Sequence, residues 1–502
     1  MKNLTSTTLA VVLLLLATSC DNGKSVRLSC SDISIVPEPV DIEVSGKLHD
    51  IRSCSCSVSD TLAEEAYTIE AKRGRITITG GSEAGIFWGR QTMREISGQF
   101  DGKIPDIRIY DEPEFKYRGV HLDCCRFFYP VEDVKKFIDI ISLHKFNVFH
   151  WHLTEDQGWR AEIKKYPLLT EVGSIRKGSI INNYNKERIV YDTPVTGYYT
   201  QDQMRDIVAY AAERHVTVIP EIEMPGHCMA ALVAYPELGC TGGPYEVDCI
   251  TADILPDILC AGKDNTVQFL KDVLDEICDI FPSEYIHIGG DESPRVRWKE
   301  CPDCQARMKE LGLGDESQLQ SFLVKEVQNH LALKGRRIIG WDEILEGGVD
   351  STATVMSWRG TQGGKAAARK GNDIVMAPTS HCYFDYFQTN DPAANGEGIG
   401  IGGYINLERA FSFNPYEDLD GNARKHIKGI QANLWTSHFP SFDDVQPRML
   451  PRIAATAEVA WSASRRSSYD DFVNKMKAAL LPIYEEEGYI YADYAFRTPP
   501  VE

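Results

Sequence analysis

Two adjacent carboxylates, Asp291 and Glu292, are the side chains of this sequence whose types and spacing most strongly suggest chemistry. They follow the apolar run 285–288 and two glycines, which places them on a loop after a strand. Acid–base catalysis uses carboxyl groups whose pKa values are separated by a shared, partly buried pocket. The alternative is a helix N-cap, because both acids suit the positive end of a helix dipole.

The elements that must position this pair alternate between strands and helices. Eight strand candidates occur at 117–123, 147–154, 216–223, 284–289, 337–341, 352–358, 373–377 and 429–435. The helical segments between them are amphipathic, as the apolar stripe between Val131 and Ile141 illustrates. Eight strands alternating with helices, without the glycine-rich phosphate turn of an open doubly wound sheet, predict an α/β protein with a (β/α)8 TIM barrel.

Active sites of such barrels lie at the C-terminal ends of the strands, and polar and aromatic residues gather at the predicted ends. They include Arg118, Asp123, His150, His152, Asp156, Glu223, His227, Trp341, Trp358, Tyr383, Asp385 and Trp435. Tryptophans offer flat walls for a sugar ring, while arginine and aspartate supply partners for hydroxyls. His150, His152, Glu223 and His227 lack a recognised metal-ligand spacing, so we predict neither a metal nor a cofactor.

The chain is predicted to divide into four parts. Residues 1–20 form a signal peptide and 21–112 a small α+β domain, with strands near 33–36, 67–70 and 76–79 and a helix at 83–96. Residues 113–465 form the barrel. Residues 466–502 are expected to be a C-terminal helical extension that packs on the barrel.

The first twenty residues have the order of a secretory signal, with Lys2, an apolar run at 9–17 and small residues before Cys20. The tetrad 17–20 resembles a bacterial lipobox, which would make Cys20 the lipidated residue; plain cleavage and secretion is the alternative. We therefore expect an exported, periplasmic or outer-membrane lipoprotein that meets a membrane only through this anchor. The net charge of −20, without a basic patch, argues against a nucleic-acid partner.

Fourteen cysteines fit an oxidising compartment. Cys301 and Cys304 have the spacing of a redox motif or of half a zinc site, but no second paired ligand set of the usual spacing accompanies them. We therefore expect a local disulfide there. One pair among Cys240, Cys249 and Cys260 is expected to close the loop between them.

Several motifs, in order and spacing, resemble the β-N-acetylhexosaminidases of glycoside hydrolase family 20. They are Arg118 to Asp123 with Arg126-Phe127, His150 to Leu153, Asp156 to Trp159, Glu223 to His227, His287 to Glu292, Gly340 to Ile344, Ser357 to Gly360 and Tyr383 to Asp385. The resemblance covers nearly the whole mature chain, including the small N-terminal domain. It implies an exo-acting enzyme whose substrate is a glycan ending in β-linked N-acetylhexosamine.

The family is an exception among retaining glycosidases, because the acetamido oxygen of the substrate attacks the anomeric carbon. By match to the motifs, Glu292 would be the general acid and base, Asp291 would orient the acetamido group, and Tyr383 would hydrogen-bond its oxygen.

The resemblance also implies roles in substrate binding. Trp341, Trp358 and Trp435 would wall the pocket, and Arg118 and Asp385 would bind ring hydroxyls. Asp156 and His227 would form a relay to Glu292, although Glu155 competes with Asp156 for this role.

One position departs from the family pattern. A glutamate usually follows the last tryptophan by two residues and binds outer hydroxyls of the sugar, whereas this chain has Ser437. The missing carboxylate suggests a pocket that accepts N-acetylglucosamine modified at C6, for example by sulfate; the alternative is a replacement acceptor from a nearby loop.

Two other functions are open. A glycan-binding lipoprotein without activity would leave Glu292 without a role. A hydrolase with a separate carboxylate nucleophile would act on sugars that lack the acetamido group.

Overall fold

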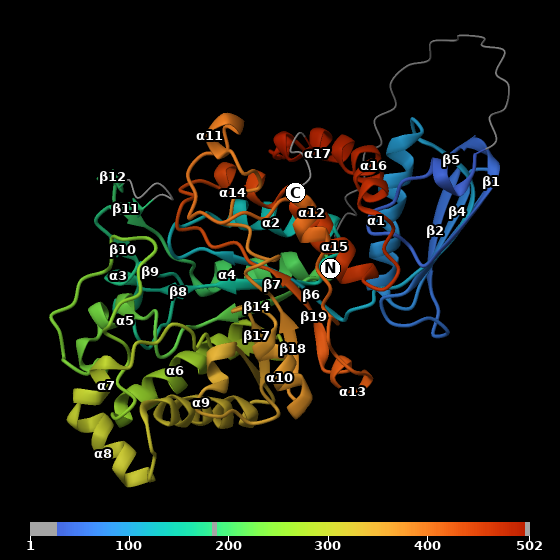
Figure 1. The fold of residues 1–502 in the computed structure, drawn as a ribbon. Coiled ribbons are helices and arrows are strands. Elements are labelled where there is room, and N and C mark those ends of the chain that lie inside the picture. The colour runs from blue at the N-terminus through green and yellow to red at the C-terminus, as the bar shows by residue number, and fades with distance from the viewer. Residues whose placement is uncertain (1–27, 183–187, 497–502) are drawn as a thin grey trace, which may run out of the picture.

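The computed structural model describes residues 28–182 and 188–496, so the predicted signal and Cys20 lie outside the described residues. Eight parallel strands form a closed barrel, in the order β14-β15-β16-β17-β18-β19-β6-β7 (Figure 1). Their bounds are Tyr117–Asp123 (β6), Val148–His152 (β7), Thr217–Glu221 (β14), Tyr285–His287 (β15), Arg337–Trp341 (β16), Thr354–Ser357 (β17), Asp373–Met376 (β18) and Ile427–Ala432 (β19). Each overlaps one predicted strand, which confirms the predicted fold.

Helices cover the outside of the barrel. They include α2 (Val131–Leu143), α4 (Gln201–Ala212), α6 (Asp264–Ile280), α9 (Glu316–Leu333), α10 (Gln362–Lys370) and α15 (Arg452–Ser462). In α2 the predicted stripe is buried, with Phe137 and Ile138 fully enclosed. Burying such stripes against the strands supplies most of the stability of these helices, because isolated helices of this length are marginal in water.

The N-terminal domain is a five-stranded sheet with one long helix packed against it. The strand order is β1 (Asp41–Asp50), β5 (Lys103–Asp111), β3 (Tyr67–Lys72), β4 (Arg75–Gly80) and β2 (Ser53–Val58), and the helix is α1 (Glu83–Gln99). The strand predicted at 33–36 is wrong. Its apolar side chains are buried, but the backbone N–H groups of Ser34 and Val36 donate to Gln99 and Glu95 of α1 instead of to a neighbouring strand.

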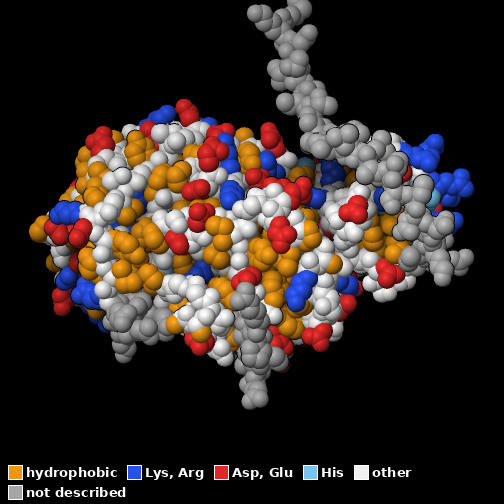
Figure 2. Space-filling view, turned by 90° about the horizontal axis from the view of Figure 1, so that it is seen from above, with side chains coloured by type: hydrophobic (Ala, Val, Ile, Leu, Met, Phe, Trp, Pro, Cys, Tyr) orange, Lys and Arg blue, Asp and Glu red, His pale blue; other side chains and the backbone are white. Residues whose placement is uncertain are grey.

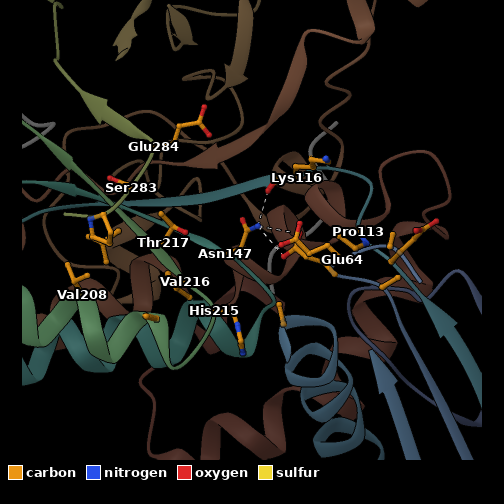
Figure 3. A pocket seen from close by; sticks show the side chains of 18 residues that line it. Glu64, Pro113, Lys116, Asn147, Val208, His215, Val216, Thr217, Ser283 and Glu284 are labelled. Atoms are coloured by element: carbon orange, nitrogen blue, oxygen red, sulfur yellow. Dashed lines mark hydrogen bonds between the residues drawn. The ribbon is translucent and has the colours of Figure 1, made fainter. Parts of the chain in front are cut away.

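Buried charges join this domain to the N-terminal end of the barrel. Arg118, at the start of β6, forms a two-pronged ion pair with Glu65, with both nitrogen–oxygen distances 2.8 Å. Lys145 is fully buried and lies 3.3 Å from the Asp111 carboxylate. A cavity of about 670 Å³ lies beside these contacts, lined by Glu64, Lys116, Asn147 and Glu284 (Figure 3). It is at the end of the barrel opposite the expected active site.

The C-terminal helices α16 (Tyr469–Ala479) and α17 (Leu481–Glu487) contact both domains. Tyr484 bonds to His144 on the barrel side, and Glu487 pairs with Arg94 of α1. The predicted extension therefore packs on α1 as well as on the barrel. Over the barrel, acidic and basic side chains are interspersed on the face shown in Figure 2. Within the described residues, no helix is both long and apolar enough to cross a membrane.

Candidate active site

A cavity of about 290 Å³ opens at the C-terminal end of the barrel. Its walls come from the loops that follow six of the eight strands: Arg126 after β6, His227 after β14, Asp291 and Glu292 after β15, Trp358 after β17, Tyr383 and Asp385 after β18, and Trp435 and Ser437 after β19. The barrel thus brings together side chains that lie up to 311 residues apart (126 to 437).

The backbone before the carboxylate pair explains the two glycines. Gly289 and Gly290 have φ angles of +61° and +104°, and a Cβ at Gly289 would lie 1.7 Å from Glu223 Oε2. Glu292 itself has a φ of 40°, a region that non-glycine residues rarely adopt outside constrained sites. The next helix, α7 (Val296–Glu300), has Arg295 as its N-cap, so the helix-cap interpretation of Asp291 and Glu292 is wrong.

Asp291 is buried in the pocket, and its Oδ1 has no hydrogen-bond partner among the described residues. Burial raises the pKa of this carboxyl to about 6, even though the nearby imidazole of His227 acts in the opposite direction. At neutral pH this side chain is therefore mostly ionised.

His227 connects this pair to a second pair of acids. Its Nε2 lies 3.6 Å from Asp291 Oδ2 and 3.5 Å from Glu292 Oε2, while its Nδ1 lies 2.8 Å from Glu155 Oε1 and 3.3 Å from Asp156 Oδ2. Burial alone would lower the pKa of His227, but the surrounding carboxylates, Glu155 first, raise it well above its usual value. Both candidate acids meet the histidine, and Glu155 is the closer one.

Arg126, not Arg118, is the arginine of the pocket. Arg118 lies at the opposite end of the barrel, bound to Glu65, so its predicted role in binding ring hydroxyls is wrong. Asp123, at the end of β6, accepts the backbone N–H of Arg126 and shapes the turn. The Arg126 guanidinium lies 2.9 Å from Glu155 and 5.0 Å above the Trp435 ring, and its Nε has no partner among the described residues.

Aromatic rings form the walls. Trp358 and Tyr383 are stacked, with ring centroids 6.1 Å apart, and the Trp358 indole N–H donates to Glu343 at 2.9 Å. Trp341 is fully buried and does not line the cavity: its ring lies 5.8 Å from that of Trp435, and its N–H donates to Glu221. The prediction of Trp341 as a wall is corrected to a support behind Trp435.

Two further polar residues, Asp385 and Ser437, line the pocket. Asp385 is buried with one oxygen unpartnered within the described part of the chain, and burial raises its pKa to about 7. Ser437 lines the cavity where the resemblance predicts a carboxylate. The residues predicted from sequence that reach the cavity are thus His227, Asp291, Glu292, Trp358, Tyr383, Asp385 and Trp435, with Asp156 behind His227.

Comparison with known proteins agrees with this geometry. The profile of "Glycosyl hydrolase family 20, catalytic domain" matches residues 115–464, and that of "Glycosyl hydrolase family 20, domain 2" matches 23–112. A β-hexosaminidase of Porphyromonas gingivalis is 44% identical over 429 residues, which are 83% of this chain and 53% of that protein. This chain therefore spans about half the length of that relative.

Two further relatives match over most of both chains. A β-hexosaminidase of Akkermansia muciniphila is 32% identical, covering 88% of this chain and 89% of its own. The crystal structure of a β-N-acetylhexosaminidase from Bacteroides fragilis superposes with a TM-score of 0.79 at 31% identity, covering 91% and 97% of the two chains. The chain described here belongs to glycosyl hydrolase family 20.

Proposed function

We propose that this chain is an exo-acting β-N-acetylhexosaminidase that removes terminal β-linked N-acetylglucosamine or N-acetylgalactosamine from glycans. One observation carries the proposal. Buried polar atoms of Arg126, Asp291 and Asp385 have no partner in the described residues, yet all three residues line one cavity with aromatic walls. Buried polar groups are normally hydrogen-bonded, so this set suits a ligand with several hydroxyl and amide groups.

The proposed reaction is assisted by the substrate. The acetamido oxygen attacks C1 while the bond from C1 to the leaving oxygen breaks, and Glu292 gives its proton to that oxygen. Asp291 accepts the acetamido N–H and stabilises the positive charge of the oxazolinium intermediate. Water then attacks C1, Glu292 takes its proton, and the acetamido group reforms. Tyr383, beside Trp358, would donate to the acetamido oxygen.

The test uses chromogenic aryl glycosides. We expect the wild type to release the aryl group from an N-acetylglucosaminide and not from a plain glucoside, and Glu292→Gln to abolish release at an unchanged melting temperature. Release of the aryl group by neither protein would favour a glycan-binding protein without activity. Hydrolysis of the plain glucoside would instead favour a separate carboxylate nucleophile.

A narrower specificity is proposed for the same pocket. Ser437 removes a negative charge that would repel an acidic group at C6, and Arg126 supplies a positive one in the same cavity. We expect a 6-sulfated N-acetylglucosaminide to be hydrolysed at least as fast as the unsulfated one. A strong preference for the unsulfated substrate would rule out this specificity and leave the activity itself untouched.

The exported lipoprotein remains a proposal, supported by the order of residues 1–20. Replacing Cys20 by Ala should move the protein from the membrane fraction to the soluble fraction in a bacterial host. An unchanged distribution would exclude the lipid anchor.

A further inference from the structure

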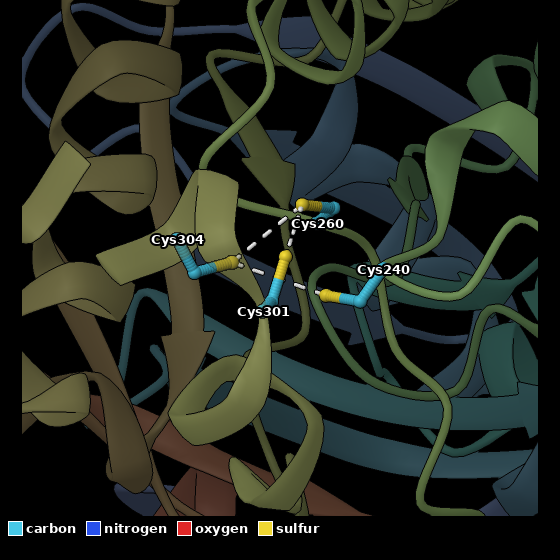
Figure 4. Close-up of side chains that lie close together, drawn as sticks. All are labelled: Cys240, Cys260, Cys301 and Cys304. Atoms are coloured by element: carbon cyan, nitrogen blue, oxygen red, sulfur yellow. Dashed lines mark hydrogen bonds between the residues drawn. The ribbon is translucent and has the colours of Figure 1, made fainter. Parts of the chain in front are cut away.

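Four cysteines from three separate segments converge outside the pocket (Figure 4). Cys240 follows the short helix η2 (Pro236–Leu238), Cys260 precedes α6, and Cys301 and Cys304 flank the start of α8 (Pro302–Leu311). The sequence predicts disulfides here, but all four cysteines are free thiols, so that prediction is wrong. The sequence pattern does not reveal Cys240 and Cys260 as a second ligand pair, because these two residues are twenty positions apart and come together only in the fold.

We propose that these four cysteines bind a structural zinc ion. Zinc holds four thiolates tetrahedrally at about 2.3 Å, which sets the sulfur–sulfur distance at about 3.8 Å. The Sγ atom of Cys260 lies 3.6 Å from that of Cys301 and 3.5 Å from that of Cys304, and the Cys240 and Cys304 sulfurs are 3.9 Å apart. A disulfide needs about 2.0 Å.

The surroundings suit a negatively charged metal centre. Four thiolates around Zn²⁺ carry a net charge of −2. Two cationic side chains donate hydrogen bonds to backbone carbonyls that are close in sequence to Cys240 and Cys260. Lys263 Nζ donates to the carbonyl of Gly239 at 2.7 Å, and Arg307 Nη2 donates to that of Gly262 at 3.3 Å. Such outer contacts orient metal ligands and offset their charge.

Local backbone geometry also favours thiolates at this point. Cys304 lies in the first turn of α8, where the helix dipole stabilises negative charge. Gly262 packs against the turn between Cys301 and Cys304 so closely that a Cβ would lie 2.3 Å from Cys304 N.

The metal would join the two loops that carry the reactive groups. The loop after β14 holds His227 and both Cys240 and Cys260, and the segment after β15 holds Asp291, Glu292 and the other two cysteines. Trp298 already links these segments through its indole N–H, which donates to the Leu259 carbonyl at 2.9 Å. Four protein ligands leave no open position for substrate, so the ion would be structural, not catalytic.

The experiment measures zinc in the purified, full-length protein by mass spectrometry of the metal. We expect one zinc per chain, and the loss of that zinc in the double variant Cys301→Ser/Cys304→Ser, with a lower melting temperature. Cys249→Ser is the matched control, because Cys249 lies in the same loop but outside the cluster. It should keep both zinc and stability.

Two measurements keep the proposal testable if the double variant does not fold. Cys240→His should retain zinc and Cys240→Ser should lose it, since histidine is also a zinc ligand. Protein refolded with cobalt should show the absorption of a tetrahedral thiolate complex. Wild-type protein without zinc, whose mass without reductant is lower by the hydrogens of two disulfides, would overturn the proposal.

Discussion

Arg126 lies in the pocket, whereas Arg118 forms an ion pair at the opposite end of the barrel. Replacing each arginine by alanine should therefore have different effects on activity and stability. Arg126→Ala removes a charged donor that lines the pocket and whose Nε has no partner among the described residues. Hydrogen bonds to charged groups contribute about 1.5–3 kcal/mol, which corresponds to a decrease in kcat/KM of about 10- to 150-fold. Arg126 also pairs with Glu155 at 2.9 Å, so this variant should lose some stability too, and its kcat/KM must be measured on the folded fraction.

Arg118→Ala should lower the stability of the protein and leave kcat/KM of the folded fraction close to that of the wild type. It leaves Glu65 without the cation that it meets at 2.8 Å, in a contact where the arginine is 1% exposed. Breaking a buried ion pair by removing one partner costs about 3–5 kcal/mol of stability. Unfolding in urea and kcat/KM on an aryl N-acetylglucosaminide, measured on the folded fraction, check both variants. An Arg118→Ala protein that is as stable as the wild type but catalytically impaired would refute the assignment.

Three further changes test the pocket. Because Asp291 must be ionised to hold the acetamido N–H and its pKa is about 6, kcat/KM should fall about tenfold per unit below pH 6, and a pH profile of Asp291→Asn should lack that limb. Ser437→Glu should raise kcat/KM on the unsulfated aryl substrate by about tenfold or more and lower it on the 6-sulfate; parallel changes on both substrates would count against the specificity. Tyr383→Phe should lower kcat by about 100-fold at an unchanged melting temperature, and a normal kcat would remove the tyrosine from the proposed mechanism.

The barrel was predictable because each of its strands contains buried apolar residues and the strands alternate with amphipathic helices. Three strands of the N-terminal sheet were not predicted. One is the central strand β5, whose alternating apolar residues Ile107 and Ile109 would have indicated a strand. The other two are β1, which is at most half-buried, and β2, which is fully exposed. Both lie at the edges of the N-terminal sheet, and pairing with their neighbours defines them.

The site was predictable wherever a residue follows a strand. Arg118 opens its strand and so projects at the opposite end of the barrel, whereas Arg126 lies three residues beyond Asp123, the last residue of the same strand. Counting from the strand end would have selected Arg126. Which of Glu155 and Asp156 lies closer to His227, and the meeting of the four cysteines, depend on loop geometry that no local pattern encodes.

The buried charges between the two domains bear on where this protein can be divided. Residue 112 is a boundary in sequence, but cutting there would leave Arg118 without Glu65 and Lys145 without Asp111, so both buried ion pairs would be lost. The isolated barrel should therefore be less stable than the barrel with its N-terminal domain attached.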